Sequence, residues 1–268
     1  METLKYTFIQ NALIGVILIS ISAAIIGTYV VTRRMVFISG GITHACFGGL
    51  GLGYYLGISP IAMASVIAVI SGVGVEYVSR RQHIREDSAI AVIWALGMAV
   101  GTLFIFLTPG YVPELNSFLF GSILTINYID LSVFLIYTIV LVGFFIIFYK
   151  QIIACAFDRD FAKVASLPER FINYSMMVLI AICIVLTIKL IGVMLLLSLF
   201  TLPQMIAELF YKRFSSMIYA SVAISAFSGL TGLMISYYLN VPSSATIVIT
   251  LVVLYTLARL IKRQFTTI

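Results

Sequence analysis

His44 is the only histidine inside an apolar segment of this sequence, and an imidazole can bind a metal ion or carry a proton near neutral pH. It lies in a glycine-rich stretch. If that stretch is a helix, Gly40 and Gly48 fall one turn before and one turn after it on the same face. Small residues allow a second helix or a ligand to approach a membrane helix closely. The pattern predicts a groove beside the imidazole, with His44, Thr43, Gly40 and Gly48 as candidate residues of a functional site.

Two interpretations of His44 remain open from the residues alone. A neutral imidazole is a good ligand for zinc, manganese or iron, and an ionisable residue inside a membrane is costly enough to indicate a functional site. The same ring could instead pack between helices, with a hydrogen bond to a neighbouring carbonyl. No catalytic residues are predicted. The sequence has no GxxxxGK[ST] loop, no HExxH motif and no nucleophile elbow, so we expect neither an enzyme nor a P-loop ATP site.

A second candidate is the short polar stretch between residues 157 and 168. Asp158 is placed to cap a helix whose first turn carries Asp160, and Lys163 further along complements the helix dipole. Pro168 ends that helix. Apolar residues recur there at helical spacing, namely Phe157, Phe161, Val164 and Ala165. The spacing predicts a short amphipathic helix that lies on the membrane surface or docks into a groove of a partner, and it favours neither.

The elements that position these stretches must be membrane helices. The chain of 268 residues is 62% hydrophobic and only 10% charged, whereas a soluble domain has about 25% charged residues. Its apolar runs are long and continuous, which predicts an all-α polytopic membrane protein rather than a β-barrel. The net charge of +6 comes from short basic clusters between apolar runs. Such clusters are typical of cytoplasmic loops, so we expect contact with membrane lipid and no nucleic-acid partner.

About nine apolar runs reach the roughly 20 residues that a membrane span requires, with eight or ten spans also possible because Pro203 interrupts one run. With the N-terminus outside, every double-basic cluster falls on the cytoplasmic side. We expect one transmembrane domain over residues 1–268. The expected spans are 8–31, 35–57, 60–78, 88–108, 129–149, 171–188, 190–210, 216–239 and 242–260, and a short surface or re-entrant helix is expected at 112–125.

Carboxylates near the span ends are expected to be solvated or to cap helices. Asp87 is placed to cap the span that starts at Ser88. Glu76 and Glu208 lie near cytoplasmic ends of spans, where a solvated side chain is the more common outcome than a proton relay.

Five groups of residues, taken in order, resemble the permease subunit of metal ABC transporters, the zinc/manganese/iron family of ABC-3 type. Residues 39–45 correspond to the Gly-Asp-x-x-Ser-His-Ala helix of that family, and 86–90 to its Glu-Asp-x-Ala-Ile helix start. Residues 157–163 match its cytoplasmic coupling helix, Phe-Asp-x-Glu-Phe-Ala-Lys. The late motifs correspond to 192–196 with Leu202-Pro203, and to 236–243. The resemblance covers nearly the whole chain.

The resemblance implies an importer for divalent transition metal ions, with the metal as cargo and no permanently bound cofactor. It also implies a homodimer in the cell membrane, two ATPase subunits at the cytoplasmic face and an extracytoplasmic metal-binding protein. The metal or translocation path would be lined by His44, Thr43, Gly40 and Gly48. The residues of the ATPase-coupling helix would be Asp158, Asp160, Phe161, Ala162, Lys163 and Ser166.

Two departures from the family pattern keep other functions open. The family has an aspartate four residues before the histidine, and here that position is Gly40. Because this carboxylate is absent, a permease for iron chelates or haem remains an alternative function. Ser166 stands where the family usually has a glycine, and Arg159 where a proline is common. A stand-alone secondary transporter is a further alternative, and it predicts charged residues in the middle of spans.

Overall fold

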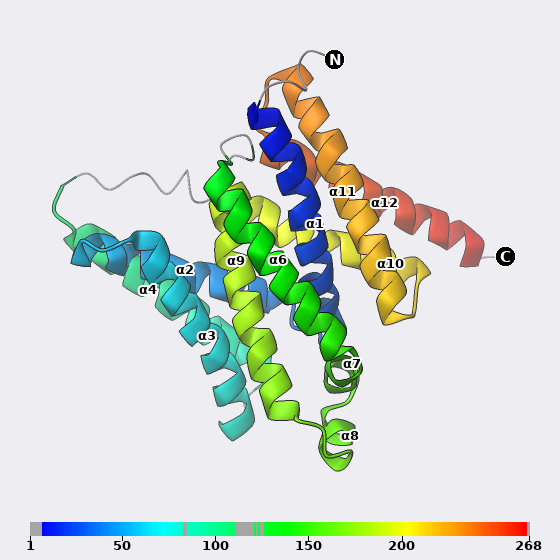
Figure 1. Cartoon of the computed structure of the whole chain (residues 1–268), viewed down its shortest axis with the longest axis horizontal. Helices are drawn as coiled ribbons and strands as arrows, with labels where there is room; N and C mark the ends of the chain where they lie inside the picture. The colour runs from blue at the N-terminus through cyan, green and yellow to red at the C-terminus, as the bar shows by residue number, and fades with distance from the viewer. Residues whose placement is uncertain (1–6, 83–84, 111–120, 122, 124–125, 267–268) are drawn as a thin grey trace. The chain divides into compact units, whose positions relative to one another are not determined.

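The described part of the chain is helical throughout its regular structure. The computed structural model describes residues 7–82, 85–110, 121, 123 and 126–266 (Figure 1). The expected fold class, an all-α multi-pass membrane protein, is confirmed. Its helices are α1 (Thr7–Thr32), α2 (Phe37–Leu56), α3 (Pro60–Gln82), α4 (Glu86–Leu107), α6 (Tyr128–Ile147), α7 (Tyr149–Phe157), α8 (Arg159–Val164), α9 (Glu169–Leu199), α10 (Leu202–Phe210), α11 (Phe214–Leu239) and α12 (Ser243–Thr266).

Seven helical segments of the described residues are long and apolar enough to cross a membrane, so the expected count of about nine is not confirmed. The glycine-rich α2 has 20 residues but is not among the seven. Its many glycines contribute little to its hydropathy. The segment Glu169–Phe210 counts as one, although Gly192 has a non-helical backbone there, with φ 78° and ψ 172°.

The helices group into two compact units. Unit 1 contains the described residues among 1–31, 116–143 and 187–268, and unit 2 those among 32–115 and 144–186. The glycine-rich helix and the predicted amphipathic helix both belong to unit 2. The expectation of one permease domain remains a prediction.

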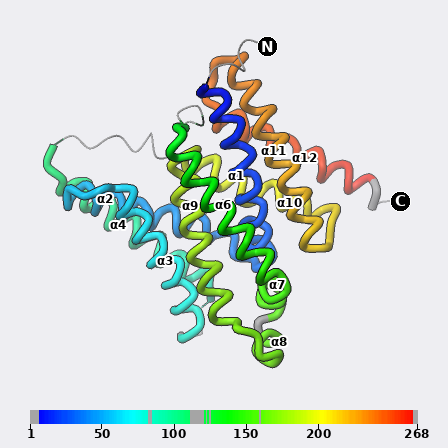
Figure 2. Tube along the Cα trace, in the orientation of Figure 1, coloured from blue at the N-terminus to red at the C-terminus, as the bar shows by residue number. Residues whose placement is uncertain are grey.

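Within unit 2, α2 lies directly against α3 and α4 (Figure 2). A Cβ atom added at Gly49 would lie 2.6 Å from Cα of Ala64 on α3, and one added at Gly48 would lie 2.9 Å from the Gly97 carbonyl oxygen on α4. A Cβ at Gly97 would in turn lie 2.5 Å from Cα of Ala45. The glycines therefore bring helix backbones into contact. The face predicted to open a groove is occupied by α4.

Within unit 1, polar side chains connect neighbouring helices. The Ser22 and Thr138 hydroxyls lie 3.0 Å apart between α1 and α6. Gln204 of α10 donates from Nε2 to the Ala23 carbonyl of α1 at 2.9 Å. Lys189 of α9 forms an ion pair with Asp130 in the first turn of α6.

The expected cap at Asp87 is wrong. Helix α4 begins two residues before Ser88, at Glu86, and its N-cap residue Arg85 makes no side-chain cap hydrogen bond. Asp87 instead lies in the first turn, where its charge favours the helix dipole, and pairs with Arg85 at 3.6 Å. Glu208 is exposed, as expected. Apart from Gly121 and Ile123, the helix expected at 112–125 lies outside the described residues.

Candidate functional site

The His44 imidazole packs against side chains of α4. Its ring stacks on the Trp94 indole with centroids 4.3 Å apart and planes inclined by 18°. Its Nδ1 lies 3.1 Å from the Met98 sulfur. Trp94 and Met98 are four residues apart and so share one face of α4. The ring is held by an aromatic face and a thioether, rather than by the carbonyl considered from the sequence.

Trp94 also fills the place next to Gly40. A Cβ atom added at Gly40 would lie 2.9 Å from Cζ3 of the indole. This is the position where the family pattern has its aspartate, one turn from His44. Thr43 is buried, and its hydroxyl has no hydrogen-bond partner within the described residues. The environment of His44 is therefore uncharged and crowded on the α4 side.

The donors around His44 in one copy of the chain are too few for a tight metal site. Among the described residues, no group of three or more His, Cys, Asp or Glu side chains could hold a metal ion. A structural zinc site takes about four such ligands. One imidazole beside one thioether suits brief coordination of a passing ion or contact with a larger ligand.

The predicted amphipathic helix is present as α8, and its predicted cap is confirmed. The Asp158 carboxylate accepts hydrogen bonds from the backbone N–H groups of Asp160 at 3.0 Å and Phe161 at 2.9 Å. Lys163 pairs with Asp160 at 3.0 Å. Because the cap satisfies orphan N–H groups within the first turn, this short helix is fixed locally by its own sequence.

The end of α8 explains the usual glycine of the family. The N–H groups of Ser166 and Leu167 donate to the carbonyls of Lys163 and Ala162, each at 3.0 Å, which is the hydrogen-bond pattern of a Schellman cap. Ser166 takes the left-handed conformation that this cap requires, with φ 53°. Glycine adopts it without the Cβ penalty of about 1 kcal/mol or more that serine carries.

The apolar stripe of α8 is uncovered in this chain. Phe161 is 59% exposed and Val164 is 86% exposed, while Ala162 on the other side of the helix is fully buried. Phe157, just before α8, is 63% exposed. Helix α8 also contacts α7. The stripe is therefore presented outward from unit 2.

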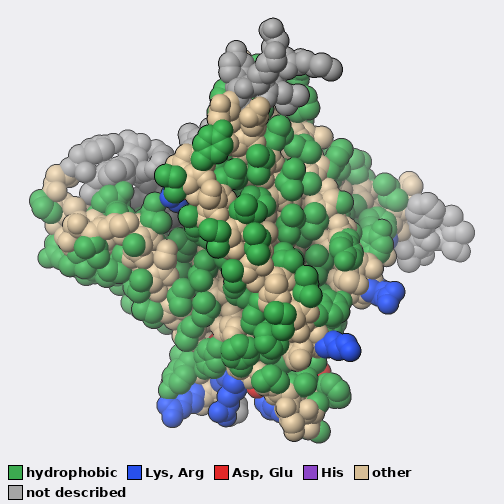
Figure 3. Space-filling view, in the orientation of Figure 1, with side chains coloured by type: hydrophobic (Ala, Val, Ile, Leu, Met, Phe, Trp, Pro, Cys, Tyr) green, Lys and Arg blue, Asp and Glu red, His purple; other side chains and the backbone are tan. Residues whose placement is uncertain are grey.

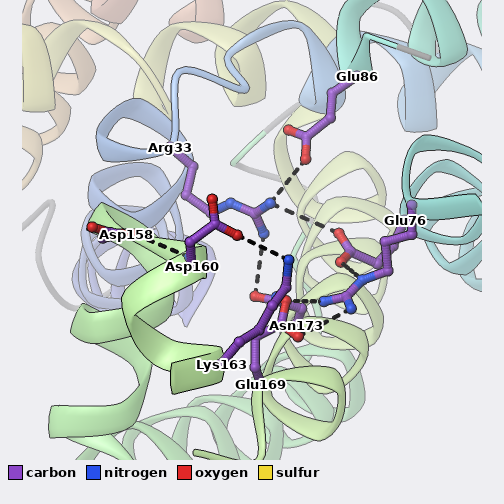
Figure 4. Close-up of polar contacts among 9 residues, drawn as sticks. Arg33, Glu76, Glu86, Asp158, Asp160, Lys163, Glu169 and Asn173 are labelled. Atoms are coloured by element: carbon purple, nitrogen blue, oxygen red, sulfur yellow. Dashed lines mark hydrogen bonds and ion pairs between the residues drawn. The ribbon is translucent and has the colours of Figure 1, made fainter. Parts of the chain in front are cut away.

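A buried cluster of charges that the sequence did not predict lies next to α8 (Figure 4). Arg80 of α3 donates to Glu76 at 2.5 Å and forms a two-bonded pair with Glu169 of α9, one of its bonds measuring 3.1 Å. Glu76 is wholly buried, so the expectation of a solvated side chain is wrong. The spacing of Glu76 and Arg80, four residues apart on one helix, was the signal in the sequence.

Arg33 extends the cluster to α4. It donates to Glu86 at 2.9 Å, lies 3.8 Å from Glu76 and donates to the Asn173 amide oxygen at 3.4 Å. Asn173 in turn donates to Glu169 at 3.1 Å. The cluster thus connects Arg33, α3 and the start of α4 to the first turn of α9. That first turn follows α8 with only a short connection through Pro168.

The sequence of the chain matches a known family of membrane transport proteins. The ABC 3 transport family matches residues 5–262. The chain belongs to this family. The chain is 32% identical to a probable metal transport system membrane protein of Chlamydia pneumoniae, over 92% of this chain and 86% of the relative. It is 26% identical to the manganese transport system membrane protein MntC of Listeria monocytogenes, covering 95% and 91%.

A solved structure supports the same assignment. The fold is similar to that of PsaBC from Streptococcus pneumoniae in complex with Fab, with a TM-score of 0.82 at 28% identity. The match covers 95% of this ABC-3 chain and 91% of the other.

Proposed function

We propose that this ABC-3 protein is the membrane permease of an ATP-driven importer for a divalent transition metal ion, namely zinc, manganese or iron. The observation that carries the proposal is α8, a capped amphipathic helix with an uncovered apolar stripe, joined to a buried charge cluster. The relatives named for metal and manganese transport support the substrate class. The metal is cargo, and the chain itself is not an enzyme.

The proposed importer needs partners for energy and for capture. The sequence has no P-loop, so ATP would be hydrolysed by separate ATPase subunits. An extracytoplasmic metal-binding protein would deliver the ion, and a second copy of the chain would complete the path in the cell membrane. The apolar stripe on α8 suits an ATPase groove because amphipathic helices commonly dock in this way.

We further propose nine spans. Helix α2 would be an additional span that is shielded from lipid on two sides by α3 and α4, so it tolerates its glycines. Gly192 would divide the segment Glu169–Phe210 into two spans. The paired Lys189 and Asp130 would then lie together at the outer surface.

Within unit 2, a continuous series of contacts leads from α8 toward His44. Glu169 follows α8 and is bound by Arg80 of α3. Glu76 and Arg33 connect α3 to Glu86 at the start of α4. Helices α3 and α4 both pack against α2, which carries His44. A displacement of α8 by the ATPase would reach the imidazole through this series.

The role of α8 predicts the result of Phe161→Asp. The added charge lies on the apolar stripe and should weaken ATPase binding by about tenfold or more, because a buried unpaired charge is costly. Co-purification of the ATPase subunit and metal-stimulated hydrolysis measure the effect. Tyr211→Asp, a similar change at another exposed aromatic residue, is the control and should leave both intact. Unchanged binding for Phe161→Asp would contradict a coupling role for α8.

The role of His44 predicts that His44→Ala reduces metal uptake by at least about tenfold, the scale of effects seen even for groups behind metal ligands. Its thermal stability should change little, because the stacked pair contributes only about 0.5 to 1.5 kcal/mol. Radiometal uptake into vesicles that contain the whole transporter is the measurement. Unchanged uptake of zinc, manganese and iron would make His44 a packing residue.

The same assay tests the alternative substrate. A metal chelate is the second candidate substrate. The surroundings of His44 are uncharged, and Gly40 stands in place of the aspartate that would bind a free ion. Gly40→Asp combined with Trp94→Ala restores the carboxylate and makes room for it, and should alter uptake of free ions. If the unaltered transporter moves a chelate and no free ion, the chelate permease is the correct function.

A further inference from the structure

The C-terminal end of α3, the N-terminal end of α9 and helix α8 border a half-open hollow of about 720 Å³ in unit 2. It is separate from the surroundings of His44 and from the apolar stripe of α8. Its lining contains both cationic and aromatic side chains. The lining residues are Tyr77, Ser79, Arg80, Arg81, Lys163, Glu169, Arg170 and Tyr174.

The hollow has an excess of positive charge that the protein does not neutralise. Its one carboxylate, Glu169, is already bound by Arg80 and Asn173. Arg81 donates to the Tyr77 hydroxyl and lies 5.5 Å from the centre of that ring. In the described part of the chain no carboxylate pairs with Arg81 or Arg170, and both side chains are exposed. Figure 3 shows basic side chains gathered at the lower end of the view, over the ends of α3 and α9.

The hollow lies at the depth in the membrane at which lipid headgroups are found. Arg81 lies at the end of one apolar candidate span and Arg170 in the first turn of another, so the hollow lies at the boundary between hydrocarbon and water. Two tyrosines, Tyr77 and Tyr174, line it. Tyrosine is enriched at that boundary, and basic pockets between membrane helices on the cytoplasmic side bind anionic headgroups.

We propose that this hollow binds the phosphate headgroup of an anionic phospholipid of the inner leaflet. Arg81 and Arg170 provide the charge-assisted hydrogen bonds, and the tyrosines flank the glycerol region. A phosphate group is matched by guanidinium forks, which form two parallel hydrogen bonds with its oxygens. The bound lipid would sit beside Arg80 and Glu169 without replacing their ion pair.

The test measures lipid retention directly and does not depend on transport. The full-length protein is purified in detergent after exchange with phosphatidylglycerol or phosphatidylcholine, and retained lipid is counted by native mass spectrometry. The test variant is Arg81→Gln with Arg170→Gln. The control variant, Lys212→Gln with Arg213→Gln, removes the same charge from two exposed residues outside the hollow. Thermal unfolding checks that both variants are folded.

The test variant should retain phosphatidylglycerol about 25-fold less, because each basic residue near an anionic surface contributes about fivefold in affinity. The control variant and all phosphatidylcholine samples should be unaffected. If both variants lost phosphatidylglycerol equally, retention would depend only on general surface charge and the site would be overturned. No loss of lipid in either variant would also overturn it. Inorganic phosphate that competes as strongly as the lipid would overturn the lipid assignment. A transporter that fails to move metal yet shows this difference leaves the lipid site intact.

Discussion

Arg80→Gln should destabilise the protein by about 3 to 5 kcal/mol. The change removes the close cation that the wholly buried Glu76 and the nearly buried Glu169 share, and losing one partner of a buried ion pair costs that much. Arg33 stays 3.8 Å from Glu76, so most of the cost falls on Glu169. Unfolding of the purified protein in detergent free of anionic lipid measures the loss. Arg81→Gln, at the next and exposed residue, should change stability by no more than about 0.5 kcal/mol under the same conditions.

A variant with an uncharged cluster distinguishes the effect of the buried charges from the effect of side-chain size. Combining Arg80→Gln with Glu76→Gln and Glu169→Gln removes all three charges and keeps polar side chains of similar size. Much of the lost stability should return, since neutral replacement of a buried ion pair is often tolerated. Transport per ATP should remain low, because the rigid pair between α3 and α9 is gone. If Arg80→Gln is as stable as Arg81→Gln, the cluster is not buried in the folded protein.

Gly48→Leu should separate α2 from α4 and cost about 1 to 3 kcal/mol, the usual range for overpacking. Its Cβ atom would meet the backbone of Gly97 at 2.9 Å, and a helix backbone has little room to move. The expected results are a lower thermal unfolding midpoint and loss of metal uptake together.

The matched control for Gly48→Leu is Gly143→Leu on α6, where an added Cβ would meet nothing within 4 Å. That variant should insert, unfold and transport like the unaltered protein. The close approach of α2 and α4 would be contradicted if Gly48→Leu were as stable as Gly143→Leu and moved metal at the normal rate.

The sequence by itself determined the features that depend on near neighbours. Long apolar runs produce membrane helices because each helix satisfies its own backbone hydrogen bonds. The cap at Asp158 and the short helix α8 were predictable because all their contacts fall within a few residues. The family pattern even indicated Ser166 as unusual, although its left-handed conformation became visible only in the structure.

Only the tertiary structure decided which helix faces meet. Apolar faces toward lipid and toward protein look alike in a membrane sequence, so the pattern does not say which helix covers which. His44 packs against Trp94 and Met98, about 50 residues away. Glu76 pairs with Arg80 of its own helix, but the cluster is completed by Arg33 and Glu169 from distant segments of the chain. Glycines such as Gly48 and Gly97 indicate in the sequence that helices pack closely. That these two glycines lie against each other follows from the complementary shapes of α2 and α4.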